Sequence, residues 1–368
     1  MPIKDDSDRH NLYLQKLAAG LYNSRIYPSL EEARLAVRSI LLDAEELKTI
    51  AEVRRMQSRI EKELNSTMGA AWAGVTGELE EIAVYEAEWQ VKALSAYTAA
   101  TLKVPVEKQI ERFITQSSMS LHSGRRVYSG VWDEFVRGQV SSMATQYNGL
   151  VLNGYQNRLT VNQIATSIKQ TTDGLIRGEA ETLARTGLSH YANAARDAMA
   201  QANKDILKYR AFSATFDNRT SPQCRHYGNK PMYWAINDDS YPRIPVHHGC
   251  RSSYYFVTDK SEIGQGKKQA VSGKQVDDIN PNRKLKYRGK KDKDIFDPKP
   301  IDAGLTQDQW LRQQPRWFVE SALDSPTKAK LFLDGNMSID KFVDMQGRPI
   351  TIARLRELDS EAFKRAGL

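Results

Sequence analysis

Residues 209–257 read YRAFSATFDNRTSPQCRHYGNKPMYWAINDDSYPRIPVHHGCRSSYYFV. This stretch holds both cysteines of the chain and three of its six histidines. Their order is Cys-x-His, then twenty residues, then His-His-x-Cys. Two pairs of metal-ligand residues joined by a loop are typical of small zinc sites. The sequence therefore predicts one structural zinc ion with these candidate ligands: Cys224, His226, His247, Cys250 and, as a further candidate, Asp217.

The same residues also allow a metal-free interpretation. Cys224 and Cys250 would then be buried thiols or a disulfide, and Asp217 would cap a turn and pair with Arg219. We expect no secretory leader, because the N-terminus lacks an apolar core, and therefore synthesis in a reducing cytoplasm. That compartment disfavours the disulfide. We expect the motif to be structural rather than catalytic.

Strand and turn formers surround the candidate ligands. Aromatic and β-branched residues at 211–216 predict a short strand, and residues 252–257 predict a second one. The run from 217 to 222 consists of turn formers. We therefore expect a small α+β domain with the order strand, cysteine turn, long loop, His/Cys turn, strand.

Two signatures lie in this stretch: F-D-x-R-T-S-x-x-C at 216–224 and P-x-H-x-x-C-R at 245–251. With Ala184-Arg185-Thr186 before them, they resemble the motif of the Mu F-like phage head morphogenesis family, the minor head proteins of tailed phages. The likeness covers residues 160–257, and a weaker one continues at 310–315 and 349–355. Many members end the motif Cys-Arg-Cys, where this chain has Ser252, so a metal would need His226 or Asp217 as a further ligand. The residues to which we assign a structural role in the motif are Asp217, Arg219, Thr220, Ser221 and Arg251.

The resemblance implies a minor head protein in the virion, inside the head and near the portal. Its implied partners are the portal protein and capsid or scaffolding proteins, and its implied role is head assembly, with DNA packaging or ejection as further roles. The resemblance does not imply an enzyme. Two alternatives stay open: a metal-dependent enzyme, in which Asp217, His226, His247 or Cys250 positions a metal-activated water, and a DNA-binding module.

Length and composition fit a multidomain globular protein. The 368 residues are 40% hydrophobic and 27% charged, which predicts two or three folded domains. The net charge of +8 favours an acidic partner such as nucleic acid. No apolar run reaches the length of a membrane-spanning helix, so we expect no membrane segment.

The chain divides into four expected parts. Residues 1–159 are a helical docking domain, 160–258 the head morphogenesis domain, 259–300 a basic flexible arm, and 301–368 a small helical module. The predicted fold class is therefore mainly α with a small α+β domain. Almost continuous helix is expected from residue 10 to 205, with helix starts at Ser29, Asp43 and Thr160. Narrow apolar stripes within residues 29–99 favour this region as the contact with the portal.

The arm at 259–300 carries twelve Lys or Arg against seven Asp or Glu and few apolar residues. Such a segment is a solvated linker, or a grip on DNA or on an acidic protein surface. Its candidate DNA contacts are Lys284, Lys286, Arg288, Lys290 and Lys291.

Replacing those five residues with glutamine tests the DNA interpretation. The slope of log affinity against log salt is expected to flatten by up to about four units, because each phosphate contact contributes roughly 0.9. Titrations of duplex DNA at several salt concentrations measure this slope. An unchanged slope would indicate a linker or a protein contact instead.

Overall fold

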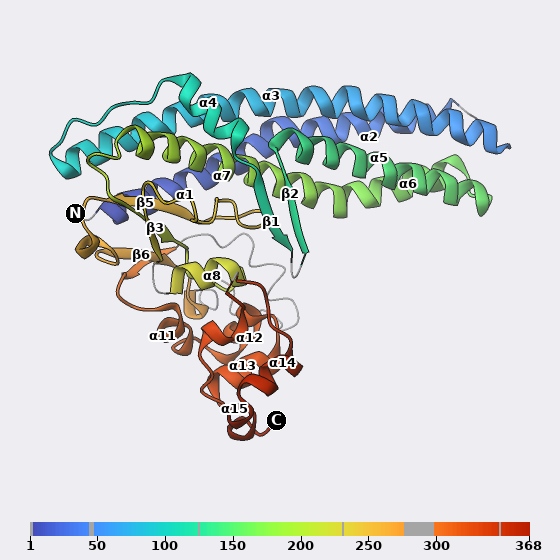
Figure 1. Cartoon of the computed structure of the whole chain (residues 1–368). Coiled ribbons are helices and arrows are strands. Elements are labelled where there is room, and N and C mark those ends of the chain that lie inside the picture. Colours follow the sequence, from blue (N-terminus) through green and yellow to red (C-terminus); the bar gives the residue numbers. More distant parts are fainter. Residues whose placement is uncertain (1–2, 44–47, 124–125, 230–231, 276–297, 346) are drawn as a thin grey trace.

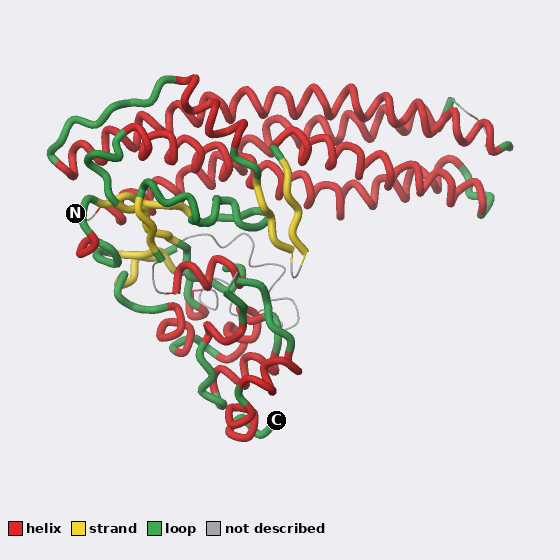
Figure 2. The backbone as a smooth tube through the Cα atoms, in the orientation of Figure 1, coloured by secondary structure: helices red, strands yellow, loops and turns green. Residues whose placement is uncertain are grey.

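The computed structural model describes residues 3–43, 48–123, 126–229, 232–275, 298–345 and 347–368. It confirms a mainly α chain with a few small antiparallel sheets (Figures 1 and 2). Long helices form one layer, and the sheets and a C-terminal group of short helices lie on one side of it (Figure 1). Among the described residues, no helix has the length and apolarity needed to cross a bilayer. The predicted DNA contacts between residues 284 and 291 lie outside the described residues.

Two continuous helical rods and one very long helix build the bundle. The first rod joins α1 to α2 through one π-helical turn, and the second joins α6 to α7 in the same way. The helices of this layer are α1 (Ile3–Leu21), α2 (Tyr27–Leu42), α3 (Ile50–Thr98), α4 (Glu107–Gln116), α5 (Trp132–Gln156), α6 (Val161–Thr171) and α7 (Arg177–Ala202).

The apolar stripe expected on the long helix is buried in the bundle core. On α3, Val53, Met56, Ile60 and Leu64 recur at helical spacing and are all buried. This face of α3 packs against α2, α5 and α7. One core contains side chains of α1 through α7, so residues on both sides of position 159 pack together.

The helix starts agree only in part with the prediction. The capping box at Thr160 is confirmed, since Thr160 Oγ1 accepts from the Gln163 amide at 3.3 Å. Ser29 does not start a helix, because the first rod is continuous there and the Ser29 hydroxyl bonds the Arg25 carbonyl at 3.0 Å. Asp43 follows the last residue of α2, and α3 instead starts from a capping box at Thr49.

Two strands interrupt the stretch that we expected to be helical. They are β1 (Met119–Ser123) and β2 (Arg126–Gly130), which pair as an antiparallel hairpin. Met119 and Leu121 are buried at period two, which is the pattern of a half-buried strand. The helical region predicted to reach residue 205 ends at Ala202. The Asn203 side chain then bonds the backbone of Lys103 in both directions, at 2.7 and 2.9 Å.

A three-stranded antiparallel sheet holds the decisive stretch, with strand order β4-β3-β5. Its strands are β3 (Tyr209–Ser213), β4 (Tyr233–Ala235) and β5 (Ser253–Val257). Both predicted strands are therefore present, and β4 is an addition inside the predicted loop. Helix α8 (Pro222–Asn229) lies between β3 and β4, where we expected only a cysteine turn.

The described ends of the predicted arm are folded. Strand β6 (Lys267–Ala270) pairs with β7 (Lys299–Asp302), and a short 3₁₀ turn (Lys260–Glu262) precedes them. Lys268 is 3% exposed and donates to the Leu305 carbonyl at 2.8 Å. Burial lowers the pKa of Lys268 to about 8. The expectation of a solvated arm is therefore wrong for residues 259–275.

The predicted C-terminal helical module packs around a core of aromatic and aliphatic side chains that also includes Phe216 and Ala270. Thr306 caps its first helix, and Pro315 separates the first helix from the second. Thr351 caps the penultimate helix. The helices are α11 (Gln307–Arg312), α12 (Arg316–Leu323), α13 (Pro326–Leu333), the 3₁₀ helix Ile339–Phe342, α14 (Ile352–Leu358) and α15 (Ser360–Arg365).

Candidate metal centre and the adjoining cleft

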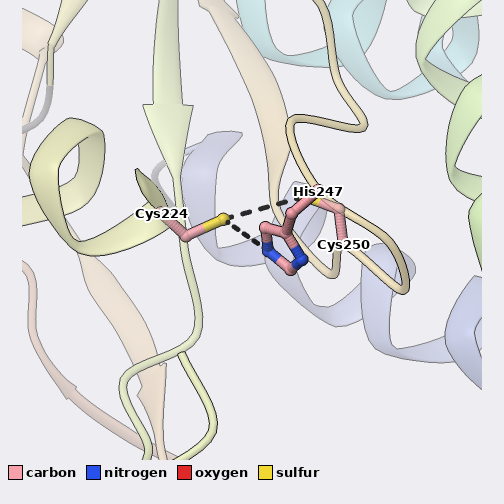
Figure 3. A group of neighbouring side chains, drawn as sticks. All are labelled: Cys224, His247 and Cys250. Atoms are coloured by element: carbon pink, nitrogen blue, oxygen red, sulfur yellow. Dashed lines mark hydrogen bonds between the residues drawn. The ribbon is translucent and has the colours of Figure 1, made fainter. Parts of the chain in front are cut away.

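Three of the predicted ligands meet below the bundle (Figure 3). Cys224 comes from α8, whereas His247 and Cys250 come from the loop that leads into β5. Cys224 Sγ lies 3.2 Å from His247 Nε2 and 3.7 Å from Cys250 Sγ. The candidate donor atoms of all three lie within 4.8 Å of one another. Both cysteines are reduced and buried.

Local sequence sets the position of each ligand. Pro222 opens α8, where its missing amide proton is not needed, and Ser221 Oγ accepts from the Cys224 amide at 3.1 Å. In the opposite loop, Gly249 has φ of +66°, a conformation that favours glycine. The Gly249 amide donates to Thr186 Oγ1 of α7 at 2.8 Å. The bundle therefore holds the loop that carries His247 and Cys250.

The His247 ring is oriented for a ligand on Nε2. Its Nδ1 lies 2.9 Å from the His248 carbonyl, so the tautomer that donates there leaves the Nε2 lone pair available. Burial disfavours charge on His247, but the neighbouring Cys250 raises the pKa of the ring. Burial would raise the pKa of the Cys250 thiol, yet Cys224 and His247 lower it well below its usual range. The group therefore stabilises a thiolate.

Asp217 forms a buried ion pair with Arg251 and does not lie among the three candidate ligands. Its two carboxylate oxygens accept from Arg251 at 2.6 and 2.8 Å. Burial alone would raise the pKa of Asp217, but Arg251 and Arg219 lower it to about 2. The Arg251 carbonyl in turn accepts from Asn11 and Gln15 of α1. Asp217 thus ties its turn to the loop of Cys250, and α1 supports that loop.

The remaining histidines lie away from the three donors. His226 lines a separate small cavity that it shares with Lys328 and Phe342 of the C-terminal region. The His248 ring packs against Phe135, with ring centroids 5.9 Å apart. Among the described residues, neither His226 nor Asp217 belongs to the group whose donor atoms lie within 4.8 Å of one another. The predicted four-residue ligand set is therefore not assembled.

The three donors suit a soft, tetrahedral metal ion. Two thiolates and one imidazole nitrogen are ligands that zinc accepts, and three protein ligands leave one coordination position for another group. The Nδ1 contact of His247 is the kind of outer-shell bond that orients a zinc-bound histidine.

Comparison with known proteins gives one match. A sequence profile described as Phage Mu protein F like protein matches residues 148–255. These residues, the Mu F-like segment, are similar in sequence to phage Mu protein F. The segment begins inside α5, includes α6, α7 and α8, and ends in β5 with all three candidate ligands. The resemblance derived from the motif is thus confirmed, and it starts earlier in the chain than residue 160. Searches of curated proteins and of solved structures gave no significant match.

Sequence reasoning missed the residues that support the Mu F-like segment from outside it. Asn11 and Gln15 lie more than 200 residues before the loop they hold, and no local pattern marks them. Thr186 belongs to the sequence motif, and its hydroxyl contact to Gly249 gives that position a physical role.

The buried ion pair of Glu86 and Arg196 was not predicted from the sequence either. Arg196 and Asp197 within an alanine-rich helix are the signal that could have revealed it.

Proposed function

We propose that this protein is a minor head protein of a tailed phage, carried in the virion near the portal and acting in head assembly. The Mu F-like match over residues 148–255 carries this proposal. The arrangement of the chain supports it, since a long helical layer offers docking surface (Figure 1). Buried charge pairs and the folded core account for the motif residues without a catalytic role.

We propose that the portal or another head protein docks at the end of the bundle formed by α2 and the start of α3. The buried stripe of α3 is already used in the core, so contact requires other side chains. Leu35 and Leu42 lie seven residues apart on one face of α2 and are 53% and 47% exposed. Ile50 opens α3 and is 46% exposed. Exposed apolar side chains that gather into one patch mark docking surfaces, and we propose that these three belong to such a patch.

Replacing Leu35, Leu42 and Ile50 with glutamine is expected to reduce incorporation into procapsids by about tenfold, since losing apolar anchors costs at least ~1.4 kcal/mol of binding. Quantitative immunoblots of purified procapsids measure the incorporation. Leu358→Gln in α14 is the matched control, because this leucine is 49% exposed and far along the chain. Equal incorporation of the triple variant and the control would show that docking lies elsewhere. Deletion of residues 29–99 is not a suitable test of docking, because it would remove α3, which forms the bundle core with α7.

We further propose that Cys224, His247 and Cys250 bind one structural zinc ion. Zinc would join α8 to the loop before β5, a region in which long loops have little regular structure.

Protein purified without chelator is expected to contain about one zinc ion per chain. Cys224→Ala should lower zinc affinity by at least about a hundredfold, because loss of a ligand exceeds the cost of losing an outer-shell partner. Elemental analysis and competition with a chromophoric chelator measure both quantities. His226→Ala is the control and should keep its zinc, because His226 lies in another cavity. Zinc-free parent protein, or equal loss in both variants, would contradict the proposal.

A further inference from the structure

A polar cleft of about 290 Å³ lies directly beside the three donors. Cys224 and His247 form part of its wall. The other walls come from α7, from the turn before α8, and from the loop before β5. The cleft therefore connects the candidate metal centre with the surface of the protein.

The walls of this cleft are rich in hydrogen-bond donors. Three guanidinium groups line it, those of Arg185, Arg219 and Arg251, together with hydroxyls such as Thr182 and Ser221. Glu181 is the carboxylate that faces them in the wall, and it pairs with Arg185 at 2.6 Å. Arg251 is also paired with the buried Asp217, so three cations lie close to two carboxylates at this cleft.

One nitrogen of Arg185, a residue that lines this cleft, has no hydrogen-bond partner among the described residues. Arg185 Nε is buried and makes no hydrogen bond within the described part of the chain, while Nη2 of the same group bonds Glu181. A buried unpaired donor is costly unless a ligand or water satisfies it. A planar guanidinium group can donate two parallel hydrogen bonds to two oxygens of a phosphate or carboxylate group. Several donors from three separate chain segments fit the four oxygens of a phosphate group better than the two of a carboxylate.

We propose that this cleft binds a phosphate-class oxyanion, held by Arg185 and Arg219, that completes the coordination of a metal ion bound to Cys224, His247 and Cys250. This inference rests on the proposed metal centre, which has three protein donors among the described residues. The inference adds a non-protein ligand to a metal ion that was proposed above only for its structural role. The phosphate group has two sources that differ in size, a free phosphate or the backbone of DNA.

Cobalt(II) in place of zinc gives separate signals for the metal and for its ligand. The thiolate-to-cobalt charge-transfer absorption reports binding to the cysteines, and the d–d bands report the group in the remaining position. Titration with inorganic phosphate is expected to change the d–d bands while the charge-transfer absorption remains. Parallel titrations with a short single-stranded oligodeoxynucleotide and with acetate separate the sources. A response to phosphate or to the oligodeoxynucleotide supports the proposal, whereas a response to acetate alone overturns the phosphate class.

Variants of the wall test the named residues. The double variant Arg185→Gln, Arg219→Gln should weaken phosphate binding by about tenfold or more, because each removes a charge-assisted hydrogen bond. Glu181→Gln should tighten it, since a negative charge leaves the wall, and a purely structural role would not predict that gain. Arg59→Gln is the matched control, because Arg59 is an exposed residue of α3, and this variant should leave phosphate binding unchanged.

The outcomes separate the two proposals. If cobalt bands form and neither phosphate nor the oligodeoxynucleotide changes them, the oxyanion site is wrong and the metal centre stands. If the double variant binds phosphate as tightly as the parent, the assignment to this cleft is wrong. If no cobalt bands form, the metal centre itself fails, and the oxyanion proposal fails with it.

Discussion

Replacing Glu86 with alanine is expected to lower the free energy of unfolding by about 3–5 kcal/mol, the range for breaking a buried ion pair by removing one partner. Glu86 is fully buried in α3. Its Oε1 accepts from Arg196 Nε of α7 at 2.6 Å, and its Oε2 lies 2.5 Å from His10 Nε2 of α1. One carboxylate therefore joins three helices of the bundle.

The cost is large because Glu86 accepts the hydrogen bond from the Arg196 Nε, although the charge of the neighbouring Asp197 carboxylate also interacts with Arg196. Its side chain is 1% exposed, and its Nη1 and Nη2 make no hydrogen bond among the described residues. Burial would raise the pKa of Glu86, but Arg196 and His10 lower it, so the carboxylate is charged. Without this charge, the buried guanidinium group would lose its hydrogen-bonded partner.

Urea denaturation followed by circular dichroism measures the change in the bundle. Glu78→Ala is the matched control on the same helix, because Glu78 pairs with the exposed Arg25. Surface pairs contribute about 0–1 kcal/mol, so the control should stay within that range. If Glu86→Ala cost no more than the control, the buried pair would not stabilise the fold.

The second large effect is expected at Asp217, where alanine should also cost about 3–5 kcal/mol. Asp217 is 1% exposed and holds Arg251 through both oxygens. Its removal would take away both of these charge-assisted hydrogen bonds of Arg251 and would release the turn that precedes α8. Asp334→Ala is the control, because Asp334 pairs with Arg316 near the surface of the C-terminal module and should cost about 0–1 kcal/mol.

The same carboxylate predicts a pH dependence. Its pKa falls from 3.8 to about 2 on folding, so the carboxylate stabilises the fold at pH above about 4. That contribution, about 2 kcal/mol from the size of the shift, is lost as the pH falls from about 4 to 2. Unfolding of the parent measured from pH 5 to 2 should therefore show this loss. Asp217→Asn should lack it, and parallel curves for both proteins would contradict the assignment.

The sequence by itself determined the helical character, the position of the α+β region and the chemistry of the candidate site. Apolar spacing in α3 and the capping box at Thr160 are local patterns, which is why they were predictable. The clustering of cysteines and histidines marked three candidate metal ligands that the fold brings together. The Mu F-like resemblance was readable for the same reason, since its signatures are short and contiguous.

The hairpin of β1 and β2 shows where local patterns failed. Five-residue strands between long helices carry a weak signal, and Met119 and Leu121 are buried only because the bundle covers them. The folded ends of the predicted arm are similar, because β6 finds its partner β7 about thirty residues later.

Only the tertiary structure decided which predicted ligands meet. Cys224 and His226 lie two residues apart on α8, and two positions on a helix point about 200° apart. One therefore faces the loop of His247, while the other faces the C-terminal region. The Asp217 carboxylate pairs with Arg251, 34 residues later, and Glu86 with Arg196, 110 residues later. Packing between distant segments sets such partners, so the spacing of residues along the chain does not predict them.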